Sequence, residues 1–319
     1  MYKVKNPSRV VNEIGMKLVT YRSGKTTSIG VVIGSDVLDL NVAFKAHLGG
    51  SFKGKKMVPL DMLGLLDLGS KGLSEVKKVV RAADGSKHLL PLKKVKLMAP
   101  IPRPRKNIVC LGLNYAEHVK EGRKEGDAPK LPPVPIFFTK PPTAVSGPYD
   151  DIVYPKVTEK LDYEAELAFV IGKKGKNITE DKAYDYIAGY MAFDDVSARD
   201  LQSKHQQWYK GKSIDTFAPM GPWIVTKDEI DNPQDLELWC KVNGVERQHT
   251  NTSDMIFDIK KIVTTLSAGI TLEVGDIFAT GTPSGVGMAH PLGLLKPGDV
   301  VEIGVEKIGS IINKVVAEK

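Results

Sequence analysis

The chain has 319 residues, of which 42% are hydrophobic and 26% charged, and its net charge is +7. This composition is ordinary for a globular protein, and no basic stretch interleaved with aromatic residues supports nucleic-acid binding. No apolar run reaches the roughly 18 residues of a membrane span, and the only cysteines, Cys110 and Cys240, lie far apart, so we expect no membrane contact and a cytoplasmic location.

Residues 1–100 are predicted to form a small α/β domain. Short alternating runs between residues 16 and 40 are typical of a strand meander. Helical spacing then follows from Leu60 to Ala83, although glycines interrupt it. The Pro-rich segment 100–105 has fixed backbone angles and few donors, which indicates a domain boundary there.

Residues 101–319 have the pattern of a strand-rich catalytic domain. Asn243-Gly244 lies between two strand-like runs and is a hairpin signal, because both residues tolerate positive φ angles. A helix is expected to start at Ser253 and to end at Gly269. The expected fold class of the chain is α+β and mostly β, and its later helices are predicted at 115–122, 180–186, 197–206 and 254–268.

A candidate acid–base pair lies in a predicted helix after a strand and a turn. His118 and Glu121 are three residues apart and would share one helix face. An adjacent carboxylate orients an imidazole, which exchanges protons near neutral pH. A chance pair on an exposed helix is the alternative, and from these two residues alone it is the more common one. The other five histidines are expected to be structural, namely His47, His88, His205, His249 and His290.

A candidate metal site is indicated by acids in two strand-like runs. Glu164 and Glu166 would project from one face of a strand, where two like charges require a cation. A second apolar run ends in Asp194-Asp195, and three carboxylates from neighbouring strands suit Mg2+ or Mn2+. A solvated edge strand is the alternative. This alternative is less well supported, because Leu167–Ile171 is apolar on both faces, as in an interior strand.

Two further segments could bind a small ligand. Arg199 and Gln202 are three residues apart on a predicted helix, and for Arg199 a salt bridge to the clustered acids is as plausible as a substrate contact. Residues 279–287 form a glycine-rich loop that lacks the Gly-Lys-Ser/Thr ending of a phosphate-binding loop. A pocket for a small oxygenated ligand is the better expectation.

The order of these motifs resembles the fumarylacetoacetate hydrolase family. The resemblance covers about residues 105–305 and rests on Gly112-Leu113-Asn114-Tyr115 with His118, Glu164-x-Glu166, Asp195 to Gln202, Gly211-Lys212-Ser213 and Thr280 to Val286. It implies a β-rich catalytic fold, usually a homodimer, that binds Mg2+ or Mn2+ through Glu164, Glu166 and Asp195. The first aspartate ligand of the large family members has no clear counterpart, which indicates the shorter acylpyruvase-like branch.

The resemblance also implies roles for the remaining residues. His118 and Glu121 would act as a pair on a mobile lid, and the glycines and prolines of segment 117–135 suit such a lid. Contacts to the substrate or its oxyanion are implied for four residues, Arg199, Gln202, Lys212 and Thr282.

The activity expected from the resemblance is hydrolysis of the C–C bond of an acylpyruvate or fumarylpyruvate, a small anionic 2-oxo acid. His118 would activate water, while Lys212 and Gln202 would stabilise the oxyanion. Oxaloacetate decarboxylation and isomerisation or decarboxylation of a 2-hydroxy-diene-dioate are the alternatives, because they share the same enolate. A metabolite-binding protein with vestigial chemistry is a third interpretation, which the complete set of catalytic side chains disfavours.

Overall fold

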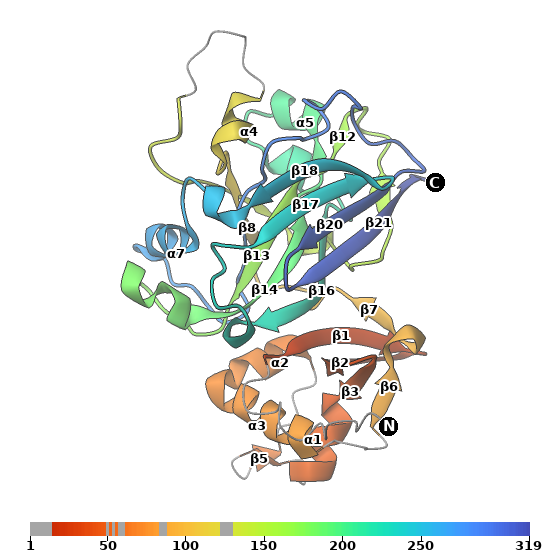
Figure 1. Cartoon of the computed structure of the whole chain (residues 1–319), viewed down its shortest axis with the longest axis vertical. Coiled ribbons are helices and arrows are strands. Elements are labelled where there is room, and N and C mark those ends of the chain that lie inside the picture. Colours follow the sequence, from red (N-terminus) through yellow and green to blue (C-terminus); the bar gives the residue numbers. More distant parts are fainter. Residues whose placement is uncertain (1–14, 49–50, 53–54, 57–60, 83–87, 122–129) are drawn as a thin grey trace, which may run out of the picture.

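Two β-sheets dominate the structure, a computed structural model that describes residues 15–48, 51–52, 55–56, 61–82, 88–121 and 130–319 (Figure 1). Within these residues the larger sheet has 12 strands in the order β6-β3-β2-β1-β16-β14-β13-β19-β8-β9, with β10 on β16 and β7 on β1. Its strands are β1 (Lys17–Ser23), β2 (Thr26–Ile33), β3 (Asp36–Asp39), β6 (Leu89–Pro91), β7 (Lys96–Met98), β8 (Ile108–Gly112), β9 (Ile136–Lys140), β10 (Val145–Ser146), β13 (Ala165–Ile171), β14 (Ile187–Asp194), β16 (Ala218–Thr226) and β19 (Ile277–Ala279).

The smaller sheet packs against the strands at the centre of the larger one. Its order is β11-β21-β20-β17-β18. Its strands are β11 (Ile152–Tyr154), β17 (Glu237–Val242), β18 (Val245–Asn251), β20 (Val300–Val305) and β21 (Gly309–Ala317). Asn243 and Gly244 both have positive φ between β17 and β18, which confirms the predicted hairpin. Two short pairs lie outside these sheets, β12 (Leu161–Asp162) with β15 (Ser197–Ala198) and β4 (Ser51–Phe52) with β5 (Lys55–Lys56).

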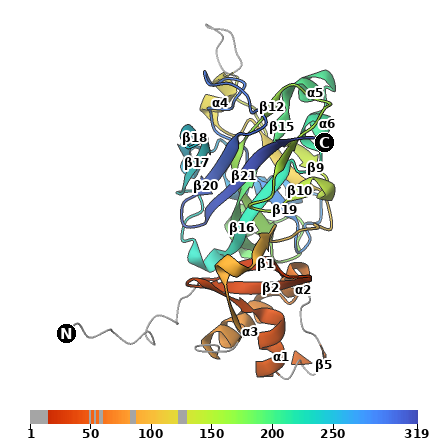
Figure 2. The same cartoon turned by 90° about the vertical axis from the view of Figure 1, so that its right-hand side faces the viewer.

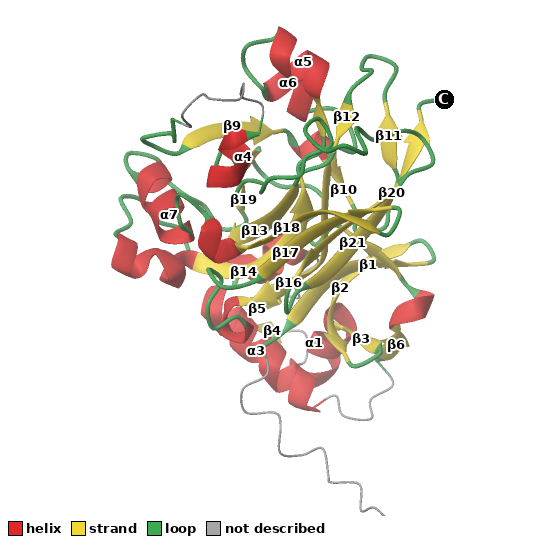
Figure 3. Cartoon of the chain, turned by 45° about the horizontal axis from the view of Figure 1, so that its top comes forward, coloured by secondary structure: helices red, strands yellow, loops and turns green. Residues whose placement is uncertain are grey.

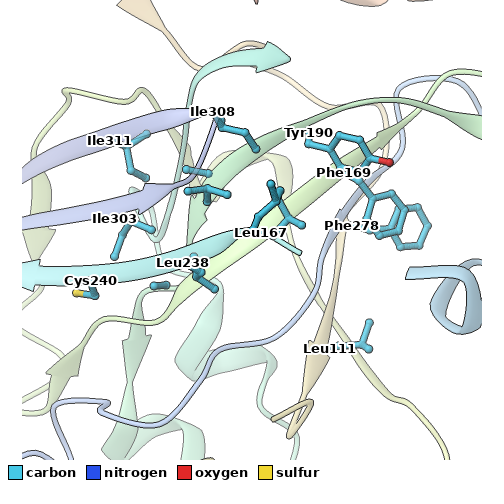
Figure 4. Close-up of a cluster of buried hydrophobic side chains, with 14 of the residues drawn as sticks. Leu111, Leu167, Phe169, Tyr190, Leu238, Cys240, Phe278, Ile303, Ile308 and Ile311 are labelled. Carbon is cyan, nitrogen blue, oxygen red and sulfur yellow. The ribbon is translucent and has the colours of Figure 1, made fainter. Parts of the chain in front are cut away.

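The main hydrophobic core lies between the two sheets. Figure 4 shows Leu167 and Phe169 of β13 in this core together with Leu238, Ile303 and Ile311 of the smaller sheet. Every residue of β13 and β14 is buried, because the opposite face of the larger sheet is covered as well. The interior strand predicted from its two apolar faces is therefore confirmed.

The first three α-helices contribute buried side chains to the core on the second face of the larger sheet, and all helices are drawn red in Figure 3. The α-helices are α1 (Leu40–Leu48), α2 (Met62–Asp67), α3 (Gly69–Ala82), α4 (Ala116–Lys120), α5 (Arg199–Lys204), α6 (Tyr209–Lys212) and α7 (Ile259–Ser267). The 3-10 helices are η2 (Leu92–Lys94), η3 (Pro142–Ala144), η4 (Glu180–Tyr186), η5 (Lys227–Glu229) and η6 (Thr252–Asp254). None of the helices in the described residues is long and apolar enough to cross a membrane, and the cytoplasmic location stays a prediction.

The larger sheet continues across the predicted boundary at residue 100. Strand β1 pairs with β16 in antiparallel register, so the N-terminal meander extends the sheet that carries the later strands (Figure 2). The predicted meander is confirmed by β1, β2 and β3. The division into domains 1–100 and 101–319 stays a prediction.

The predicted start of the last helix is wrong. Ser253 lies in η6, and α7 begins after Asp258, whose carboxylate accepts a hydrogen bond from the Lys261 amide at 2.7 Å. Both residue types cap helices, but the backbone of 252–254 makes its own turn before the helix begins. Gly269 follows the helix end with a φ of +84°, as its position predicted.

Candidate active site

Three buried carboxylates meet where β13 begins and β14 ends. The antiparallel register places Ala165 opposite Asp194, and the Asp195 amide donates to the Glu164 carbonyl at 3.0 Å. Oxygens of Glu164, Glu166 and Asp195 lie within 4.8 Å of one another. These acids are 6% exposed or less, so they do not form the solvated edge that was the alternative.

The surroundings of Glu166 test whether this cluster fits a cation. Its Oε2 accepts a hydrogen bond from the Gly281 amide at 2.8 Å, while its buried Oε1 has no hydrogen-bond partner among the described residues. Burial raises the pKa of Glu166 well above its usual value, and the charges of Asp195 and Glu164 raise it further. A divalent ion would remove this penalty, and carboxylates are ligands that Mg2+ and Mn2+ prefer. The acidic triad can therefore hold Mg2+ or Mn2+.

Two buried lysines already contact these acids. Lys212 Nζ lies 2.8 Å from Glu164 Oε1 and 2.9 Å from Asp195 Oδ2. Lys140 Nζ donates to Asp195 Oδ1 and to the Val196 carbonyl. Burial opposes the charge of Lys212, but Asp195 and Glu164 raise its pKa overall, so this side chain remains an ammonium.

Arg199 is held by the acids rather than exposed. Its Nε donates to Asp162 Oδ2 at 2.8 Å, and its Nη1 donates to Glu164 Oε1 at 2.5 Å and to Gln202 Oε1 at 3.2 Å. The structure thus shows the salt bridge that the sequence left as one of two options for Arg199. Burial opposes the charge of Glu164, but Lys212, Arg199 and His118 bring its pKa well below the usual value. The substrate contacts of Arg199 and Gln202 stay predictions.

Sequence reasoning missed three residues that organise the site. Asp162 accepts Arg199 Nε and also the backbone amides of Gly287 and Met288, at 2.7 and 3.0 Å. Gln248 accepts from the Ala165 amide and donates to Thr282 Oγ1 at 2.8 Å, so Thr282 is tied to a neighbouring strand. Lys140 is the third. Its only signal in the sequence is a charged residue that ends the apolar strand β9, a feature too common to single out.

His118 and Glu121 form the predicted pair at the end of α4. His118 Nδ1 lies 2.9 Å from Glu121 Oε2, and Glu121 Oε1 accepts the Gly285 amide at 2.5 Å. The carboxylate therefore orients the ring and fixes the glycine-rich loop at the same time. With Nδ1 held by Glu121, Nε2 is the ring nitrogen left to exchange protons. Residues 122–129 of the predicted lid lie outside the described part of the chain.

Comparison with known proteins identifies the family. The family described as fumarylacetoacetate (FAA) hydrolase C-terminal matches residues 107–316. The chain belongs to this fumarylacetoacetate hydrolase family. It is 40% identical to "Oxaloacetate tautomerase YisK" of Bacillus subtilis, over 94% of this chain and 100% of that protein.

Two solved structures of fumarylacetoacetate hydrolase family members share the fold of this chain. A 2-hydroxyhepta-2,4-diene-1,7-dioate isomerase from Mycobacterium marinum is 33% identical with a TM-score of 0.69, over 95% of this chain and 99% of that one. A maleylpyruvate hydrolase from Sphingobium, in complex with manganese(II) and pyruvate, is 31% identical with a TM-score of 0.74, over 95% of this chain and all of that one. The relatives are thus enzymes of more than one reaction class.

Proposed function

We propose that this protein is a Mg2+- or Mn2+-dependent tautomerase that interconverts the keto and enol forms of oxaloacetate or a similar 2-oxo diacid. The observation that carries the proposal is the His118–Glu121 pair together with the triad of Glu164, Glu166 and Asp195, since His118 is near enough to help lower the pKa of Glu164. Similarity to an oxaloacetate tautomerase over nearly the whole chain supports this choice of substrate and reaction. Of the reactions expected from the sequence, the oxaloacetate and isomerase alternatives are now better supported than C–C hydrolysis.

The proposed reaction moves one proton and breaks no bond between heavy atoms. When bound, Mg2+ or Mn2+ would supply Lewis-acid charge at the oxygens of a 2-oxo acid. His118 Nε2 removes the proton from C3 of the keto form, and the resulting imidazolium gives this proton to O2 to form the enol. The reverse direction uses the same groups. Glu121 keeps a proton on Nδ1 of His118, so that Nε2 presents its lone pair.

Two cationic side chains have distinct tasks in this proposal. The buried Lys212 ammonium stabilises negative charge that develops on O2 when C3 is deprotonated. Arg199 has its Nε and Nη1 engaged by Asp162, Glu164 and Gln202, and it holds the acids in place. Thr282 and Gln202 are proposed to contact the substrate carboxylates. A homodimer remains part of the proposal.

Hydrolysis of an acylpyruvate is the second candidate. It is supported by the fold shared with a maleylpyruvate hydrolase that binds manganese and pyruvate. Hydrolysis needs a water activated by His118, whereas tautomerisation needs only proton transfer to and from the substrate.

Product analysis separates these reactions. Purified protein with Mn2+ is given oxaloacetate, acetylpyruvate and maleylpyruvate, and enol absorbance, pyruvate and carbon dioxide are followed in parallel. We expect faster decay of enol oxaloacetate with no matching release of pyruvate. Stoichiometric pyruvate with carbon dioxide from oxaloacetate would instead identify a decarboxylase. Pyruvate from an acylpyruvate, without any tautomerase activity, would identify a hydrolase.

A further inference from the structure

The ammonium of Lys212 lies between two of the three acids of the metal triad. Its Nζ is 2.8 Å from Glu164 Oε1 and 2.9 Å from Asp195 Oδ2. These distances place one positive charge directly between two carboxylates that would also ligate a divalent ion. The lysine is 2% exposed, so solvent contributes little to screening of this charge.

Other cationic side chains also engage the oxygens of Asp195 and Glu164 around Lys212. Asp195 Oδ1 already accepts from Lys140, and Glu164 Oε1 also accepts from Arg199. An ammonium and a divalent ion that share the same oxygens would repel each other at short range in a site with little water. Oxygens that point at Lys212 therefore cannot serve a divalent ion at full strength.

We propose that Lys212 and the divalent ion compete for Glu164 and Asp195, so that metal binding releases the ammonium toward the substrate. This inference rests on the metal site of the proposed function. Without a divalent ion, Lys212 neutralises the two acids and keeps the cluster folded. With the ion in place, the ammonium shifts away from Glu164 and Asp195 and becomes available to the charge on O2.

The ammonium already lies near an aromatic ring while it contacts the acids. Lys212 Nζ lies 5.3 Å from the centroid of the Phe138 ring, whose face attracts cations. Phe138 also packs edge-on against Trp208, with ring centroids 5.4 Å apart, so the ring is held in place. A short movement toward this ring would keep the charge buried but off the acids.

Lys140 provides a matched control for the competition. It is buried, carries the same charge and pairs with the same Asp195, but through the other oxygen, and it makes no ion pair with Glu164. Loss of either lysine removes one positive charge from the cluster. Only loss of Lys212 also removes the ammonium that bridges two acids of the triad.

The test is Mn2+ binding, measured by titration calorimetry on EDTA-stripped protein. We expect Lys212→Met to bind Mn2+ about tenfold more tightly than the wild type, within the ordinary range of coupling between two sites. Lys140→Met should show a clearly smaller gain in Mn2+ affinity. The rise in melting temperature on addition of Mn2+ should also be largest in Lys212→Met, because its acids lack their bridging cation. If Lys212→Met does not fold without metal, Lys212→Arg is measured instead, and its larger, charged fork should weaken Mn2+ binding.

Each outcome decides the proposal. Equal gains in Mn2+ affinity in the two lysine variants would show a general effect of charge. This result would overturn the proposed competition but not the metal site. Weaker Mn2+ binding in Lys212→Met would show that the lysine supports the ion, and would also overturn it. If neither the wild type nor Lys212→Met binds Mn2+, the metal assignment of the proposed function fails, and the competition fails with it.

Discussion

Glu121 bonds His118 through one carboxylate oxygen and the backbone of Gly285 through the other, at 2.9 and 2.5 Å. One side chain thus sets the orientation of the His118 imidazole, the proposed general base, and the position of the glycine-rich loop that follows β19. Both effects depend on a residue just beyond the last residue of α4. The acid–base pair and the loop are therefore coupled.

The first prediction concerns this pair. His118→Gln should lower kcat by roughly 10²–10⁴-fold, the usual contribution of a general base. Glu121→Gln should lower kcat by a smaller factor, because the imidazole remains and only the charge that orients it is lost. Both variants should keep the Mn2+ affinity of the wild type within a few-fold, which calorimetry can check. A His118→Gln enzyme with full tautomerase activity would remove the residue from the mechanism.

The second prediction concerns the metal triad. Glu166→Ala should abolish Mn2+ binding and lower turnover by more than about 100-fold, since even residues outside the ligand set often cost that much. Burial, followed by the charges of Asp195 and Glu164, raises the pKa of this carboxyl group. Its loss removes both penalties, so the melting temperature in EDTA should stay equal or rise. Asp181→Ala, which removes an exposed acid from η4, is the control. Full turnover by Glu166→Ala in Mn2+ would contradict the assignment.

The third prediction separates the two interpretations of Arg199. Arg199 is a buried partner of Asp162 and Glu164. Arg199→Met should therefore destabilise the fold by about 3–5 kcal/mol, because each of these carboxylates loses a buried cationic partner. Arg199→Lys should lose less stability. Chemical denaturation measures the free energy of unfolding of both variants. A raised KM with unchanged stability would instead support the substrate contact predicted from the sequence.

The fourth prediction concerns pH and His249, one of the histidines expected to be structural. His249 lies 2.9 Å from Glu237 and 3.2 Å from Glu246. The hydrogen bond to Glu237, followed by that to Glu246, raises the pKa of His249 above 6.5 although partial burial opposes it. A group whose pKa is higher in the folded state than in the unfolded state stabilises the fold at pH values below its unfolded-state pKa. This stabilisation is lost as the pH rises through the folded-state pKa.

His249→Gln should therefore be less stable than the wild type near pH 6 and equal to it near pH 9. Because His249 is about half exposed, the difference should be only a few tenths of a kcal/mol. Melting curves across this pH range measure it. A difference that grows with pH would have the wrong sign and would exclude the ion pairs as its cause.

The sequence was sufficient for features that depend on local pattern. Apolar runs on two faces predicted the interior strand β13, and the alternating acids predicted a cluster that antiparallel pairing with β14 does bring together. The Asn243-Gly244 turn likewise follows from backbone preferences. The resemblance to the fumarylacetoacetate hydrolase family added the order of motifs across the later two thirds of the chain.

Long-range partners could not be read from the sequence. Lys140 and Asp195 are 55 residues apart, and Gln248 and Ala165 are 83 residues apart, so nothing local marks them as neighbours. The pairing of β1 with β16 could not be predicted from the sequence either, because pairing between strands about two hundred residues apart depends on the packed fold. Arg199 carried two equally plausible interpretations until its acidic partners were placed.

The most direct test of the central claim is the approach to keto–enol equilibrium of oxaloacetate from both sides. A tautomerase must accelerate ketonisation of the enol and enolisation of the keto form by the same factor and leave their ratio unchanged. We expect this result for the Mn2+-loaded wild type, with the acceleration lost in EDTA and in His118→Gln. If oxaloacetate reaches equilibrium at the same rate with and without the Mn2+-loaded protein, the protein is not a tautomerase of this substrate.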